Sequence, residues 1–314
     1  MNRSFRCILT KVTNRLRNVF RDLTYRMHGV LHDAVTISTR QGRLTLQTKN
    51  DHVAKCLFQA RQYEYDNSLR AVHFLKRMRF IQGANMCMLD VGSNIGMITT
   101  GLLLANEIQN AIAIEPEAKN FSLLVKNVIQ NGLSKRVCCL QVAVGNMAKN
   151  LTMEISPSNA GDHRIRASSA FHAAERYNES SRETVQVKAL PLREILKLPE
   201  ICNAGMAKPN LLWIDVQGYE GYVFEGGRDF LSLGIPAISE IWPYGICRSG
   251  MSLERFVSIV SSIWSDYWVE RREKYSRYPI SVFDCYLKEL GTDGYSENVI
   301  FTKGGTPTDS PIFP

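Results

Sequence analysis

A glycine-bearing turn in the first third of the sequence has the residue types needed to bind an anionic group. It reads Leu-Asp-Val-Gly-Ser-Asn-Ile-Gly over residues 89–96 and leads into a predicted helix. Glycine lets the backbone approach a ligand closely, and the free N–H groups of a helix N-terminus attract a phosphate or a carboxylate. The residues of this turn that we expect at the ligand are Asp90, Gly92, Ser93, Asn94 and Gly96.

The glycine spacing of this turn does not match a dinucleotide site. A fingerprint G-x-G-x-x-G that begins at Gly92 needs glycine at positions 94 and 97. Those positions hold Asn94 and Met97, and the next glycine is Gly96. The pattern D-x-G-x-N-x-G therefore favours a methyltransferase loop over a nicotinamide-binding one.

A glutamate ends the next predicted strand, 19 residues after Gly96. At this place in an α/β sheet, a carboxylate can accept hydrogen bonds from both hydroxyls of a ribose. A strand-terminal glutamate alone is more often an ordinary surface residue, but the upstream turn favours the ribose role. We therefore expect Glu115, together with Pro116, to contact the cofactor.

Two further carboxylates follow later predicted strands and are candidates for catalysis. Asp215 ends the strand at 211–216, and Glu240 lies near the end of the strand at 237–241. Because ligands bind at the carboxyl ends of parallel strands, the two could form an acidic rim on which either acts as general base. Asp215 could instead cap the following helix. His163 and His172 are weaker candidates without a recognisable partner.

Strands and helices alternate along most of the chain. Strands are predicted at 86–91, 111–115, 137–142, 211–216, 237–241 and 299–302, and helices at 51–82, 96–107, 117–130, 219–233 and 252–265. This alternation predicts an α/β fold with a mostly parallel sheet covered on both faces. Residues 150–189 interrupt it with two strands, at 151–155 and 184–189, around a polar stretch. We interpret them as an insertion after the third strand that could cover an acceptor pocket.

The positive charge of the chain is concentrated at its N-terminus. Residues 1–50 contain ten lysines or arginines against two aspartates, which already equals the net charge of +8. Residues 3–29 have the apolar spacing of a basic amphipathic helix, and a small hairpin is predicted from 35–38 and 44–47. Such a helix could bind an acidic surface, namely an anionic membrane, a nucleic acid or an acidic partner, or it could simply dock on the domain.

The composition is that of a globular protein. The 314 residues are 45% hydrophobic, and the sequence has neither a membrane-spanning apolar run nor a secretory leader, so we expect a cytoplasmic location, with peripheral membrane association possible. The eight cysteines include no C-x-x-C pair, which predicts reduced packing residues and no metal site. We expect an N-terminal extension over 1–50, a catalytic domain over 51–303 and a flexible tail over 304–314.

Taken in order, five segments resemble the FkbM-type methyltransferases. These segments are residues 90–96, Glu115-Pro116, Asn131-Gly132-Leu133, Ala143-Val144-Gly145 and residues 214–220, and the resemblance spans roughly residues 60–302. It implies a Rossmann-like class I fold with a seven-stranded sheet. It also implies transfer of a methyl group from S-adenosylmethionine, leaving S-adenosylhomocysteine, mostly to hydroxyl groups of sugars, glycans or natural products.

The resemblance also implies roles for individual residues. The turn at 90–96 would shape the methionine end of the cofactor site, Glu115 would hold the ribose, and Ala143 would lie near the adenine. One position departs from the family: Gln217 stands where I-D-V-E-G has glutamate, and glutamine can neither act as a base nor carry charge. Asp215 and Glu220 are retained, so we expect activity.

Two other functions are compatible with the sequence. The basic N-terminal segment could direct methylation to RNA or to a protein side chain, although no aromatic and basic RNA-binding pattern accompanies the arginines. The glutamine at 217 would also suit a non-catalytic scaffold that retains the cofactor fold. The intact turn and Glu115 favour an enzyme.

Overall fold

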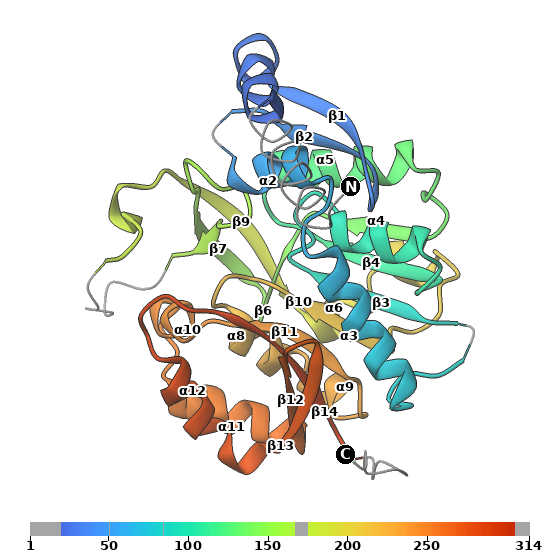
Figure 1. Cartoon of the computed structure of the whole chain (residues 1–314). Helices are drawn as coiled ribbons and strands as arrows, with labels where there is room; N and C mark the ends of the chain where they lie inside the picture. The colour runs from blue at the N-terminus through green and yellow to red at the C-terminus, as the bar shows by residue number, and fades with distance from the viewer. Residues whose placement is uncertain (1–19, 50, 84, 167–174, 305–314) are drawn as a thin grey trace, which may run out of the picture.

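The computed structural model describes residues 20–49, 51–83, 85–166 and 175–304, and its centre is an eight-stranded sheet (Figure 1). The strand order is β13-β12-β14-β11-β10-β3-β4-β5. In chain order these strands are β3 (Cys87–Val91), β4 (Asn110–Ile114), β5 (Val137–Leu140), β10 (Leu211–Ile214), β11 (Ala237–Ile241), β12 (Asp266–Arg271), β13 (Lys274–Pro279) and β14 (Glu297–Thr302). The five strands from β11 to β5 in this order are parallel, and β12, β13 and β14 pair antiparallel. The predicted mostly parallel α/β sheet is therefore confirmed.

The predicted number of seven strands is wrong, because the sheet in the described residues has an eighth strand at its edge. The hairpin of β12 and β13 was not predicted at all. Its strands are joined by Arg272 and Glu273, both with positive φ, at 51° and 64°. Glycine or asparagine normally marks such a two-residue turn, and neither is present. Most residues of β13 are exposed, two of them are charged, and the strand ends in a proline, which suits an edge strand. Its sequence shows no alternation of apolar and polar residues, so it gave no strand signal.

Helices cover both faces of this sheet. One face carries α2 (His52–Ala60), α3 (Tyr65–Arg77), α4 (Met97–Leu104) and α5 (Ala118–Gln130), and the other carries α6 (Leu192–Ile195), α8 (Glu220–Gly226), α9 (Arg228–Leu231), α10 (Pro243–Arg248), α11 (Leu253–Ile263) and α12 (Phe283–Leu290). Along β3, Met88 points to the first layer, while Leu89 and Val91 point to the second. Burial on both faces explains why the parallel strands read as continuous apolar runs.

A second, smaller sheet lies between β5 and β10 in the chain. It contains β6 (Ala143–Gly145), β7 (Lys149–Glu154), β8 (Arg164–Ile165) and β9 (Thr184–Pro191) in the order β6-β9-β7-β8. The predicted strands at 151–155 and 184–189 correspond to β7 and β9, so the predicted insertion after the third strand is confirmed. In Figure 1 this sheet stands beside the carboxyl ends of the central strands.

The N-terminal hairpin is part of the core of the molecule. β1 (Ala34–Thr39) and β2 (Gly42–Gln47) pair as predicted, and Leu44 and Leu46 are fully buried with the side chains of α4 and α5. The described residues 20–31 are helical, whereas the first part of the predicted basic helix lies outside the described residues. The boundaries at residues 50 and 303 stay predictions. Within the part of the chain that is described, no helix is long and apolar enough to cross a membrane.

Two asparagines of α5 hold the hairpin through its backbone. The buried Asn127 accepts from the N–H of Thr45 (2.7 Å) and donates to the carbonyls of Thr45 and Ile95 (3.3 and 2.8 Å). Asn131, at the exposed end of the helix, makes the equivalent pair of bonds to Arg43 (2.9 and 2.7 Å). These bonds fix the register of the hairpin against α5.

Asn127→Ala should destabilise the fold far more than Asn131→Ala. The first substitution leaves buried backbone groups without partners, which costs about 2–4 kcal/mol, whereas water replaces the bonds of Asn131 and its loss costs at most about 1 kcal/mol. Urea unfolding of the two variants measures the difference. Equal losses would show that the hairpin is not held through the buried asparagine.

Candidate functional site

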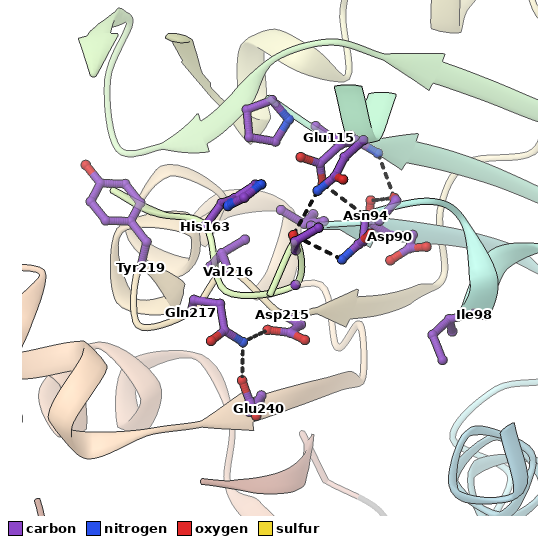
Figure 2. A pocket seen from close by; sticks show the side chains of 18 of the residues that line it. Asp90, Asn94, Ile98, Glu115, His163, Asp215, Val216, Gln217, Tyr219 and Glu240 are labelled. Carbon is purple, nitrogen blue, oxygen red and sulfur yellow. Dashed lines mark hydrogen bonds between the residues drawn. The ribbon is translucent and has the colours of Figure 1, made fainter. Parts of the chain in front are cut away.

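A pocket opens at the carboxyl ends of β3, β4, β10 and β11, where the chain leaves the centre of the sheet in opposite directions. In open α/β sheets, ligands bind at this kind of switch point. The predicted site residues that line the pocket are Asp90, Gly92, Ser93, Asn94, Glu115, Pro116, Ala143, Asp215 and Glu240. Gly96 does not line it and lies one turn behind, at the N-cap of α4. The sheet therefore gathers nearly all the predicted residues into one pocket (Figure 2).

The glycine turn is packed against the end of β10. Gly92 has φ of 85°, and a Cβ at this position would lie 1.9 Å from the carbonyl oxygen of Asp215. The hydroxyl of Ser93 donates to the carbonyl of Asp90 (2.8 Å) and accepts from the N–H of Ile114 (3.0 Å). Only glycine fits at position 92, and Ser93 ties the turn to β4.

Glu115 joins the turn to the end of β4. Its Oε2 accepts from the N–H of Asn94 and its Oε1 from the N–H of Glu117, both at 2.9 Å. A carboxylate has about four acceptor positions, so each oxygen can take one further bond. Burial raises the pKa of Glu115 to about 8. The free acceptor positions border the pocket, and hydroxyl donors there would favour the ionised form.

Asp90 is buried beneath the turn. It is 2% exposed and accepts a hydrogen bond from the hydroxyl of Thr99 on α4. Burial raises the pKa of this carboxyl to about 6, and hydrogen bonds from Thr99 and Ser93 oppose the shift. Asp90 thus links β3 to the first helix after the turn.

Gln217 bridges the two candidate catalytic carboxylates. Its Nε2 donates to Oδ1 of Asp215 (2.6 Å) and to Oε2 of Glu240 (2.7 Å), as Figure 2 shows. The residue adopts φ of 53°, which turns its side chain back over the end of β10. Ser296 donates to the other oxygen of Glu240 (2.7 Å). Asp215 and Glu240 therefore lie together, as the sequence predicts. The side-chain amide of Gln217 joins them, a role that was not predicted for this residue.

The carboxyls of this cluster have raised pKa values. Burial and then the charge of Asp215 raise the pKa of Glu240 well above its ordinary value. Burial also raises the pKa of Asp215, while hydrogen bonds from Gln217 and Glu240 lower it. Two neighbouring carboxylates repel each other when both are ionised, so the pair tends to share one proton. Within this pair, the hydrogen bonds from Gln217 and Glu240 favour the ionised form of Asp215.

The interpretation of Asp215 as a helix cap is wrong. Tyr219 is the N-cap of α8, and its side chain does not cap the helix. The fully buried Glu220 accepts from the N–H groups of Val216 (3.1 Å) and Gly218 (3.2 Å) instead. Burial raises the pKa of Glu220 to about 7. Glu220 closes the turn, which leaves the side chain of Asp215 facing the pocket.

The insertion closes the pocket from the opposite side. Its Ala160 carbonyl accepts from the side chains of Asn120 (2.9 Å) and Asn94 (3.4 Å). His163 lines the pocket, and its Nδ1 accepts from the N–H of Ser156 (3.0 Å). Burial lowers the pKa of His163, so the neutral ring presents Nε2–H as a donor. His172 lies outside the described residues.

A second recess adjoins the pocket and shares Asn159, Gln217 and Glu240 with it. Other residues on its walls are His52, Asp162, Arg164, Tyr177, Trp242 and Ser296. Arg164 is fixed by Asp162 and Glu179 and lies 4.5 Å from the ring centre of Trp242 and 4.8 Å from that of Tyr177. The indole N–H of Trp242 is buried without a hydrogen-bond partner among the described residues. Ion pairs and ring contacts therefore hold the side chain of Arg164 in place on the wall of the recess.

Most residues that line the second recess were not predicted from the sequence, and neither were the asparagines that anchor the insertion. Trp242 directly follows β11 and could have been identified, since side chains beyond the carboxyl ends of parallel strands face the ligand site. Asn120 and Asn159 gave no signal, because their roles depend on the folded path of the insertion. Among the described residues, no cluster of three or more histidine, cysteine or acidic side chains is arranged to hold a metal ion.

The strand order, with the pocket at the switch point, defines a Rossmann-like α/β fold of the class I methyltransferase type. The domain model of the FkbM methyltransferases matches residues 90–255, more than half of the chain. The chain therefore belongs to the FkbM methyltransferase family. The family assignment from the five sequence segments is confirmed. No curated protein sequence matches the chain significantly.

Solved structures resemble the chain only distantly. An FkbM methyltransferase from Methylobacillus flagellatus KT is 14% identical with a TM-score of 0.42, and the match covers 91% of this chain but 59% of that one. The chain thus spans less than two thirds of that protein. TYW2 of M. jannaschii, solved with AdoMet, is 14% identical with a TM-score of 0.39 over 86% of this chain and 85% of that one. An O-methyltransferase from Bacillus cereus, solved with SAH, is 12% identical with a TM-score of 0.39 over 77% and 82%.

Gly92→Ala should prevent the correct docking of the turn, whereas Gly83→Ala should be tolerated. Both glycines have similar positive φ, 85° and 91°, but the Cβ of residue 83 would meet nothing within 4 Å. The backbone strain common to both is about 1–2 kcal/mol. The clash with Asp215 adds to it only at position 92. Thermal unfolding of both variants separates the effects, and a similar loss in both would contradict the close contact.

Proposed function

We propose that the chain is an S-adenosylmethionine-dependent methyltransferase that methylates a hydroxyl group on a sugar, a glycan or a natural product. The observation that carries this proposal is the position of Asp215 and Glu240. Both line the pocket with the family's cofactor motif, and Glu240 also lines the adjoining recess with its polar and aromatic walls. An acceptor in that recess would meet a carboxylate next to the methyl donor.

The pocket residues fit the chemistry of the cofactor. The free acceptor positions of Glu115 suit two ribose hydroxyls, and Ala143 and Val142 offer an apolar surface for the adenine. The turn at 92–96 and the buried Asp90 border the end that would hold the methionine part. When bound, the cofactor supplies an electrophilic methyl group on a sulfonium, which needs only an aligned nucleophile.

The carboxylate pair provides the proton acceptor. The ionised Asp215 would accept the proton of the acceptor hydroxyl, while Glu240 would keep its own. The bound cofactor would supply its methyl group to the hydroxyl oxygen, with the bond between sulfur and methyl carbon broken and S-adenosylhomocysteine released. Gln217 holds both groups in place through its amide and brings no charge of its own. Its carbonyl oxygen is free to accept a bond from a second hydroxyl of the substrate.

The recess suits a neutral, hydroxylated acceptor. The side chains of His52 and Ser296 on its walls can bond to hydroxyl groups. Asp215 and Glu240 disfavour an anionic acceptor, and the guanidinium of Arg164 is already paired with two carboxylates. These features support a sugar-like acceptor over the phosphates of RNA.

Glu115→Gln should weaken binding of S-adenosylmethionine by about 10- to 100-fold, because the amide carries no charge and replaces one of the two acceptor oxygens by an NH2 donor. Affinity of the wild type should rise as the pH rises through about 8, since ionised Glu115 is the better acceptor. The variant should lack this pH dependence. Isothermal titration calorimetry measures both effects.

Glu117→Gln is the matched control, because this neighbouring buried glutamate caps α5 and does not line the pocket. It should bind the cofactor like the wild type. If the wild type fails to bind S-adenosylmethionine or prefers NAD, the chain is a scaffold or uses another ligand. Either result contradicts the proposal.

Asp215→Asn should lower turnover by about 100-fold or more, the usual contribution of a general base, with little change in cofactor affinity. Transfer of labelled methyl groups to a panel of glycans and hydroxylated metabolites gives the assay. Because the pKa of Asp215 is raised, activity should fall on the acid side at a higher pH than an ordinary aspartate would give. Gln217→Glu adds a third carboxylate, so the loss of activity on the acid side should begin at a still higher pH.

The amide substitution Asp266→Asn is the control, since this buried aspartate lies on β12 away from the pocket. Turnover of Asp215→Asn equal to that of the wild type would exclude Asp215 as the base. Incorporation of the label into RNA and not into glycans or metabolites would overturn the acceptor class.

A further inference from the structure

The helix at residues 20–31 presents a row of exposed apolar side chains. The exposed fractions are 71% for Phe20, 56% for Leu23, 64% for Met27, 83% for Val30 and 67% for Leu31. At about 100° per residue, these five positions fall within an arc of about 100°. The five side chains form one continuous row along the helix, which we call the apolar stripe.

The opposite side of the same helix is fixed to the domain. Tyr25 is 5% exposed, and its hydroxyl donates to the carbonyls of Asp51 (3.2 Å) and Gln47 (3.3 Å). Arg21 donates to the carbonyl of Gln59. Asp22 pairs with Lys55 (2.8 Å). The helix is therefore held in one orientation, with the apolar stripe directed away from the core.

The segment that carries the stripe has an excess of positive charge in its sequence, because residues 1–50 contain ten basic residues against two acidic ones. On the described helix, Arg26 flanks the stripe with a side chain that is 71% exposed and pairs with Asp22 (2.8 Å). In the sequence, Phe5, Leu9, Val12 and Leu16 continue the three- and four-residue spacing of the stripe. An apolar stripe combined with excess positive charge is the composition of helices that lie in the interface of an anionic bilayer.

We propose that the apolar stripe docks the enzyme onto a membrane surface rich in anionic lipid. The side chains of the stripe would insert among the acyl chains while the basic residues contact the headgroups. RNA is a less suitable partner, because its phosphates bind charged and polar side chains and would leave the apolar stripe exposed to water. A second copy of the chain is also a poorer fit, because it would bring two segments of charge +8 together.

Sedimentation of the full chain with vesicles tests this proposal. The wild type should bind vesicles of phosphatidylcholine and phosphatidylserine and not vesicles of phosphatidylcholine alone, and salt should weaken the binding. Replacement of four stripe residues by serine (F20S, L23S, M27S and V30S) should reduce binding about tenfold or more. The same variant should keep the wild-type circular dichroism spectrum and affinity for S-adenosylmethionine.

A variant with exposed apolar residues replaced elsewhere (I129S, M147S and L233S) is the matched control and should bind vesicles like the wild type. The proposal is overturned if the wild type does not bind anionic vesicles, or if the stripe variant binds them equally well. A dimer that depends on the stripe and does not bind vesicles would overturn it as well. Cofactor affinity is measured separately, so failure of the membrane proposal is distinguishable from failure of the proposed enzymatic function.

Discussion

The site depends on a backbone contact between two loops that are 120 residues apart in the chain. β3 and β10 are neighbours in the sheet, the N–H of Asp215 donates to the carbonyl of Val91 (3.0 Å), and the Cα of Gly92 packs on the carbonyl of Asp215. No side chain fits between them. The turn proposed to bind the cofactor and the turn that carries the proposed catalytic carboxylate are therefore positioned by one contact, and neither can shift without the other. Alignment of a methyl donor with an acceptor requires this kind of rigidity, because small misplacements lower the rate strongly.

A second constraint is the crowding of carboxyl groups around one pocket. Asp90, Glu115, Asp215 and Glu240 come from the ends of adjacent strands, Glu220 begins α8, and each of the five has a raised pKa. Buried charges are costly unless donors compensate them. Backbone N–H groups supply these donors to Glu115 and Glu220, and the amide of Gln217 supplies them to Asp215 and Glu240. The glutamine where the family has glutamate thus removes one negative charge from the cluster and adds a donor shared by two carboxylates.

The sequence predicted those parts of the site whose signal is local. The glycine turn, Glu115 and the acidic residues after β10 and β11 follow directly from strand ends and from backbone requirements, and they meet in the pocket. Parts that depend on tertiary context were missed. The β12–β13 hairpin turns through two charged residues with positive φ, which no sequence rule favours. The bridging role of Gln217 also depends on its left-handed backbone conformation. The recess combines residues of the insertion with residues that follow β11 and residues that directly precede β14. None of these neighbours is adjacent in the chain.

The two halves of the site differ in the way they are held, and this difference bears on specificity. Residues of the proposed cofactor pocket lie in short turns at the strand ends, fixed by backbone hydrogen bonds and by glycine contacts that tolerate no side chain. Residues of the proposed acceptor recess, such as Arg164, Tyr177 and Trp242, are held by side-chain ion pairs and ring contacts, many of them within the insertion. Side-chain contacts can be exchanged one residue at a time without disturbing the sheet, whereas the backbone contacts cannot. The architecture therefore allows the proposed acceptor recess to change while the pocket and the carboxylate pair stay in register.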